Sequence, residues 1–159
     1  MSNGSLADLL FKPETLPGWK ERLSLALDVA RGILYLHQEW YMAPEWHKNT
    51  LISTKVDIYS FGVVLLEILC CTGDMKIDIS CDDKISFFTW VYGCFVAMEL
   101  KSLVGNEEVD IHMFEKMVKV GLLCIQDDPE ARPSIKDVIL MVEGTTDIPI
   151  PPSPVPSLI

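Results

Sequence analysis

Apolar residues recur at intervals of three and four along most of the chain, which is the period of an amphipathic helix rather than of a strand. The clearest stretch runs from Pro17 to His37, and its apolar positions are Leu23, Ala26, Leu27, Ala30, Ile33 and Leu34. Its charged residues fall on the other side: Lys20, Glu21, Asp28 and Arg31. The pattern predicts a helix that packs one face on a core and leaves the other in water.

A second helix is predicted from Thr54-Lys-Val-Asp57, because a threonine N-cap with an acidic residue three positions later can form a capping box. The residues that follow, from Ile58 to Cys71, are apolar on nearly every side. A helix of that kind usually forms the buried centre of a domain. We expect Asp57 to lie near the start of this central helix.

Three further helices are predicted by the same period, at Ile85 to Leu100, Met113 to Ile125 and Ser134 to Glu143. Ser134 can cap the last of them, since serine is a preferred N-cap residue. No stretch alternates cleanly with a period of two, so we expect no strand. The fold class is therefore predicted to be all-α.

The chain divides into a folded part, residues 1–146, and a proline-rich tail, residues 147–159. A chain of 159 residues fits one domain that can bury a sizeable core. Five prolines between Ile148 and Pro156 prevent a helix there and predict an extended or disordered tail. Such a tail could bind a proline-reading domain, but a passive tail is the favoured interpretation.

Charge excludes two classes of partner. Thirteen Lys and Arg against 23 Asp and Glu give a net charge of −10, which repels nucleic acid and anionic lipid surfaces.

The longest apolar stretch, Phe61 to Cys71, contains Glu67 and is too short to span a bilayer. The polar start, Met1 to Ser5, is not a secretory signal. We expect no membrane span and a cytoplasmic location for this chain.

The cysteines do not have the spacing of a metal or redox site, because no C-x-x-C occurs. Most of them lie within apolar runs: Cys70, Cys71, Cys81, Cys94 and Cys124. We expect buried, reduced thiols and no metal site.

One motif, followed by several others in a fixed order, identifies a family. Tyr41-Met-Ala-Pro-Glu-Trp46 resembles the APE segment that closes the activation loop of protein kinases. Ser53-Thr-Lys-Val-Asp-Ile-Tyr-Ser-Phe-Gly-Val-Val-Leu-Leu-Glu-Ile68 then resembles the central helix of the kinase C-terminal lobe, and a further matching block, Leu123-Cys-Ile-Gln-Asp-Asp-Pro-Glu-Ala-Arg-Pro-Ser134, follows it. Upstream, Ala30-Arg-Gly-Ile-Leu-Tyr-Leu-His37 is similar to the helix that precedes a catalytic loop.

These blocks cover nearly the whole chain, which resembles the C-terminal lobe of plant receptor-like serine/threonine kinases, in particular the lectin-type group. The resemblance implies the truncated helical C-lobe of the protein kinase fold. Intact members of the group are plasma-membrane receptors with a cytosolic kinase domain. Other kinases or receptor components would then be the candidate partners.

The resemblance also assigns roles to individual residues. Tyr41, Met42, Ala43, Pro44 and Glu45 would be the remnant of the activation segment. Glu45 would pair with Arg132, and Asp57 would bind backbone amides of the catalytic loop. Each has a simpler interpretation as well: Glu45 as a surface acid, Arg132 as a loop base and Asp57 as a helix cap.

The parts that transfer phosphate are missing. Tyr35-Leu-His-Gln-Glu-Trp40 runs directly into Tyr41, where the family has its catalytic H-R-D loop and its D-F-G metal loop. The chain also has no G-x-G-x-x-G and no V-A-x-K. The ligands for ATP and magnesium, the family's cofactors, are therefore absent, and we predict no catalytic residue, no cofactor and no kinase activity.

Three functional hypotheses stay open at this point. The chain is a catalytically inactive remnant of a receptor-like kinase, or a binding module that docks kinase partners. Alternatively, the sequence is an incomplete gene model of an active membrane receptor kinase. The sharp junction at Trp40 and Tyr41 suits the last hypothesis as well as the first.

Overall fold

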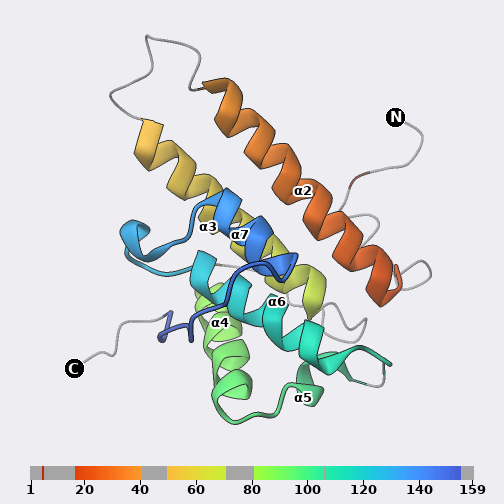
Figure 1. Ribbon diagram of the computed structural model, residues 1–159. Helices are drawn as coiled ribbons and strands as arrows, with labels where there is room; N and C mark the ends of the chain where they lie inside the picture. Colours follow the sequence, from red (N-terminus) through yellow and green to blue (C-terminus); the bar gives the residue numbers. More distant parts are fainter. Residues whose placement is uncertain (1–4, 6–16, 41–49, 71–80, 106, 155–159) are drawn as a thin grey trace.

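The computed structural model describes residue 5 and residues 17–40, 50–70, 81–105 and 107–154, and within these it contains helices and no strand (Figure 1). The helices are α2 (Trp19–Trp40), α3 (Thr50–Leu69), α4 (Cys81–Val96), α5 (Lys101–Val104), α6 (Ile111–Cys124) and α7 (Ile135–Val142). A short 3₁₀ turn, η2 (Pro129–Ala131), precedes α7. The prediction of an all-α fold is confirmed.

Helix α3 is the centre of the fold, as its nearly uniform apolar sequence predicts. Helices α2 and α6 both pack against it, and α7 lies against α2 and α6 (Figure 1). Its fully buried side chains are Ile58, Leu65, Leu66, Ile68 and Leu69. Burying each such side chain stabilises the fold by about 1.5–3 kcal/mol.

The start of α3 differs from the prediction. The helix begins at Thr50, one turn before the Thr54 N-cap that the sequence pattern indicates. The threonine is therefore an internal helical residue, and Asp57 lies in the third turn rather than near the helix start. Thr50, Leu51, Ile52 and Ser53 therefore belong to the helix and precede the predicted cap.

Helix α4 also ends earlier than predicted, at Val96 instead of Leu100. The chain turns at Met98, whose φ of +58° lies in the left-handed region. The amide of Glu99 donates to the carbonyl of Cys94, and the amide of Met98 donates to that of Phe95. This pair of bonds is a Schellman motif, which closes the helix end. A short helix that was not predicted, α5, follows.

The end of the chain packs on the helices as far as Pro154. Residues 147–154 form no regular element, yet Pro151 and Pro154 are buried. The Gln126 side-chain amide donates to the Leu122 carbonyl over 2.8 Å and to the Pro152 carbonyl over 3.2 Å. This part of the tail therefore packs on the helices. Among the described helices, none combines the length and the hydropathy needed to cross a bilayer.

Helices α3 and α6 pack closely because each contributes a glycine to the contact, Gly62 from α3 and Gly121 from α6. A Cβ atom at Gly62 would lie 2.6 Å from the Cys124 Cβ and 3.1 Å from the Gly121 carbonyl oxygen. A Cβ atom at Gly121 would lie 2.6 Å from the Leu66 Cδ2. Closer approach brings more buried atoms into van der Waals contact.

We predict that Gly62→Ala separates these helices and lowers the free energy of unfolding. The matched control is Gly32→Ala on α2, where an added Cβ meets nothing within 4 Å and should stabilise by about 0.5–1 kcal/mol. Relative to that control, Gly62→Ala should be less stable by about 1–3 kcal/mol, the usual cost of overpacking. Urea unfolding of the two variants measures the difference, and equal stability would show that the crossing relaxes freely.

Candidate functional site

Five of the residues to which the sequence assigns a role lie outside the described residues: Tyr41, Met42, Ala43, Pro44 and Glu45. The pairing of Glu45 with Arg132 therefore stays a prediction. The structure does describe the other assigned residues: Asp57 belongs to α3, and Arg132 contacts α3 at Lys55.

Arg132 connects the η2 turn to α3, because all three nitrogens of its guanidinium group donate a hydrogen bond. Its Nε donates to the Gln126 carbonyl over 2.7 Å, and its Nη1 donates to the Lys55 carbonyl over 3.0 Å. Its Nη2 donates to the Asp127 carbonyl over 3.2 Å. Since a guanidinium carries five N–H donors, two remain beyond these three bonds.

Two further contacts hold this arginine in place. The guanidinium carbon lies 5.0 Å from the centre of the Tyr59 ring, a cation–π distance. The Lys55 ammonium in turn donates to the Arg132 carbonyl. Arg132 is thus a structural residue of the turn, and its two spare N–H groups are compatible with a carboxylate partner.

Asp57 contacts the end of α2 and does not cap α3. Its Oδ2 lies 2.9 Å from Nε2 of His37, which is buried. An ionised carboxylate only accepts hydrogen bonds, so Nε2 carries the hydrogen in this contact. The contact ties α2 to α3 just inside the segment 41–49 that connects them. The simpler interpretation of Asp57 as a helix cap is wrong, because α3 starts seven residues earlier.

A groove between α2 and α3 lies beside this contact. It has a volume of about 300 Å³ and is lined by Val29, Ile33, Leu36, Asp57, Ser60, Phe61 and Val64. Most of these side chains are apolar, and Asp57 is the one charged group among them. An apolar groove with a single carboxylate has neither the cationic donors that hold phosphates nor the paired ligands that hold magnesium.

Arg22 is an important residue that the sequence analysis missed. Its Nη1 donates to the carbonyls of Ile68 and Leu69 over 3.1 Å and 3.4 Å. These are the last carbonyls of α3, where the helix dipole favours a positive charge. Its Nη2 forms an ion pair with Glu107, and its guanidinium lies 5.7 Å from the Trp19 ring centre.

The sequence did contain a signal for Arg22. The residue is three positions after Trp19 and four before Ala26, and both of these are buried. A charged residue on the apolar face of an amphipathic helix needs a partner inside the fold. Its partners lie 46 and 85 residues away along the chain, so the sequence alone could not name them.

Buried thiols were predicted, and Cys70, Cys94 and Cys124 are buried. Burial raises the pKa of the Cys124 thiol to about 12, although the nearby positive charges of Arg132 and Lys55 act in the opposite direction. Only the thiolate is a nucleophile. This thiol is therefore unsuited to catalysis and packs as an apolar group.

The chain is similar to known protein kinases. The profile of the family described as "Protein tyrosine and serine/threonine kinase" matches residues 38–142. The chain belongs to this protein kinase family. The match begins at the end of α2 and includes α3, α4, α6 and α7, so the helical body described above is the family's C-terminal lobe.

The relatives also match the predicted group. A G-type lectin S-receptor-like serine/threonine-protein kinase of Oryza sativa subsp. indica is 32% identical over 97% of this chain and 25% of its own length. One from Oryza sativa subsp. japonica is 34% identical over the same shares. One from Arabidopsis thaliana is 30% identical over 98% of this chain and 24% of its own. The chain thus spans about a quarter of the length of these relatives.

The aligned region is longer than the chain itself. It extends over 206 residues, whereas the chain has 159, so the rice relative carries at least 47 residues inside that region that this chain does not have. An internal difference of this size is what the missing catalytic and metal loops of the sequence analysis would produce.

Replacing Arg22 should destabilise the fold much more than replacing an exposed arginine. Arg22→Met removes the donor from two buried carbonyls and breaks the pair with Glu107. We expect a loss of about 2–4 kcal/mol in the free energy of unfolding. The control is Arg31→Met, because Arg31 pairs with Glu143 on the surface over 3.4 Å, and exposed pairs contribute about 0–1 kcal/mol. Denaturant unfolding measures both, and equal losses would contradict this assignment.

The raised pKa of Cys124 leads to a prediction about pH. Because the folded state keeps the thiol proton up to about pH 12 while an unfolded thiol loses it near pH 8.5, the folded state binds more protons between these values. Stability from this group is complete below that range and falls as the pH rises through it. Cys124→Ala should flatten this alkaline loss, and native Cys124 should resist iodoacetamide at pH 8. Rapid alkylation of the folded chain, detected by mass spectrometry, would contradict the prediction.

Proposed function

We propose that the chain is a catalytically inactive form of the C-terminal lobe of a receptor-like serine/threonine kinase. The observation that carries this proposal is internal to the chain: Gln38-Glu39-Trp40 continues directly into Tyr41-Met-Ala-Pro-Glu45. The family's catalytic aspartate, its metal-binding asparagine and its metal-binding D-F-G aspartate belong between these two segments.

The contacts on either side of this junction support the proposal. His37 and Asp57 are hydrogen-bonded, so the end of α2 lies against the third turn of α3. The groove that Asp57 lines offers one carboxylate and no cation, and a second pocket beside His37, lined by Lys55 and Lys136, offers no carboxylate that could hold a metal ion. Catalysis of phosphoryl transfer depends on positioned cations and metal ions that neutralise the developing charge. Losing all of them together removes most of the catalytic effect, and the ion pair of Glu45 with Arg132 would then be purely structural.

Direct measurement tests the proposal. Titration calorimetry of the whole chain with ATP and magnesium should show no binding, and incubation with labelled ATP and a general protein substrate should transfer no phosphate. An intact receptor-like kinase domain serves as the positive control. A dissociation constant in the micromolar range, about −8 kcal/mol, or transfer that a dead control does not show, would refute inactivity.

A second candidate function is favoured by the length of the alignment. At least 47 residues of the rice relative have no counterpart here, and an incomplete gene model would produce the same gap. The natural product would then be an active receptor kinase that uses ATP and magnesium. Sequencing of full-length transcripts separates the two candidates, because only this one requires coding sequence between the codons for Trp40 and Tyr41.

The partners and location follow from the same proposal. Receptor-like kinases or their associated proteins would be the partners, on the cytosolic side of the plasma membrane. A net charge of −10 supports protein partners over nucleic acid.

A further inference from the structure

A cavity lies where the end of α4 meets α5, α6 and the tail. We call it the α4–α6 pocket. It has a volume of about 800 Å³, within the range of ligand-binding sites. Its apolar lining consists of Phe95, Val96, Met98, Leu100, Ile111 and Ile150.

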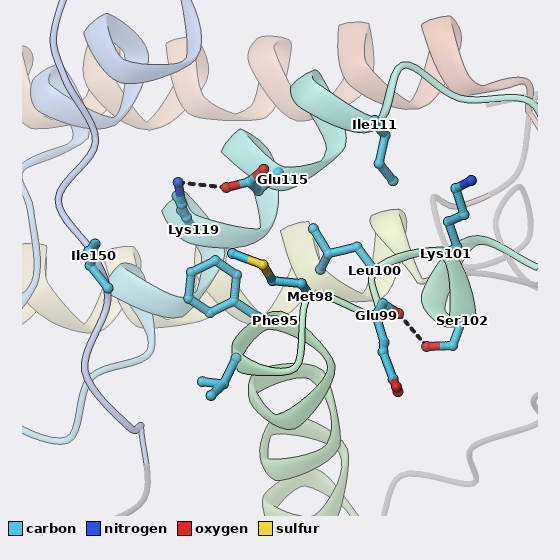
Figure 2. Close-up of a pocket in the computed structure, with 11 residues that line it drawn as sticks. Phe95, Met98, Glu99, Leu100, Lys101, Ser102, Ile111, Glu115, Lys119 and Ile150 are labelled. Carbon is cyan, nitrogen blue, oxygen red and sulfur yellow. Dashed lines mark hydrogen bonds and ion pairs between the residues drawn. The ribbon is translucent and has the colours of Figure 1, made fainter.

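Exposed apolar side chains gather around this pocket. Val96 is 61% exposed, Met98 is 92% exposed and Ile150 is 80% exposed. They come from the end of α4, the turn after it and the tail, three segments that converge on one place (Figure 2). Single exposed apolar residues are ordinary, but a contiguous group of them around a cavity marks an interaction surface.

The turn that ends α4 does not require a methionine at position 98. Its φ of +58° places it at the residue after the helix, which is normally Gly or Asn because a larger side chain is strained there. Its backbone bond to Phe95 needs no side chain. The end of α4 therefore explains the backbone conformation of Met98. It does not explain why an apolar side chain is almost fully exposed there.

The polar groups of the pocket narrow the choice of occupant. Glu115 and Lys119 pair with each other over 2.8 Å, and Lys119 also lies 5.9 Å from the Phe95 ring centre (Figure 2). The lining also includes Glu99 and Lys101, so its two acidic and two basic groups balance. The excess of negative charge comes from exposed Glu108 and Asp110 just before α6 and from the whole chain, which carries −10. A second copy of the chain or an anionic lipid is repelled by this charge, whereas a basic segment is attracted.

We propose that the α4–α6 pocket docks an amphipathic segment of a partner protein, with apolar side chains in the pocket and lysine or arginine residues flanking them. The flexible, polarisable methionine side chain suits such a site because it can adapt to the side chains that enter. Basic flanks would lie near Glu99, Glu108 and Asp110.

This docking site goes beyond the proposed function and does not depend on whether the chain transfers phosphate. The α4–α6 pocket lies on α4, α5, α6 and the tail, away from the junction of α2 and α3 at which the family's catalytic segments are missing (Figure 1). A binding role for the lobe is therefore compatible with both candidates, the inactive lobe and the incomplete gene model of an active kinase.

The test uses the complete chain and a labelled synthetic helical peptide with leucines on one face and lysines on the other. Binding is followed by fluorescence anisotropy. Met98→Asn should weaken binding by about tenfold, and it should not lower the unfolding temperature because Asn tolerates a positive φ. Met98→Leu, which keeps an apolar side chain, should bind within about twofold of the parent chain.

Two further variants make the test specific to the pocket. Ile150→Asn changes an exposed tail residue that lines the pocket and should also weaken binding. Ile85→Asn is the matched control, because Ile85 is 57% exposed at the other end of α4 and lies outside the pocket. It should leave the affinity unchanged.

Three outcomes would overturn the proposal. The first is equal binding by the parent, Met98→Asn and Ile150→Asn chains, which would place the peptide elsewhere. The second is equal binding of a peptide with glutamate in place of lysine, which would remove the charge argument. The third is concentration-dependent self-association that Met98→Asn abolishes in sedimentation, which would make a second copy the occupant.

Discussion

The close crossing of α3 and α6 is the constraint on which the rest of the structure depends. Gly62 and Gly121 let the two backbones approach until an added methyl group at either residue would overlap the opposite helix. Most α3 residues from Ile58 to Leu69 are buried, although Ser60 is exposed, and α7 contacts both α2 and α6 (Figure 1). A buried apolar helix can satisfy its backbone internally everywhere except at its ends.

Polar contacts join α3 to other elements at its carboxyl end and in its first half. At its carboxyl end, Arg22 reaches from α2 to the carbonyls of Ile68 and Leu69. In its first half, Arg132 and Lys55 join α3 to the η2 turn, and His37 joins Asp57 to α2. Arg22, Lys55, Asp57 and Arg132 thus hold elements of the lobe together. This is consistent with a kinase lobe that keeps its architecture without its catalytic loops.

The sequence alone determined the all-α class, the family, the central position of α3 and the capping of α7 by Ser134. These features depend on local periodicity and on motifs in a fixed order, both of which can be read along the chain. Element ends were less predictable: α3 starts at Thr50, before the predicted cap at Thr54, and α4 stops at Val96 because of the turn at Met98.

Only the tertiary structure decided where the polar side chains act. The partners of Arg22, Asp57 and the backbone-bound Arg132 are separated from them by as many as 85 residues, and no local pattern specifies such a distance. The α4–α6 pocket likewise combines the end of α4 with Ile150, more than 50 residues later. Periodicity predicts which face of a helix is buried, but the packing of helices in three dimensions determines which distant groups share that face.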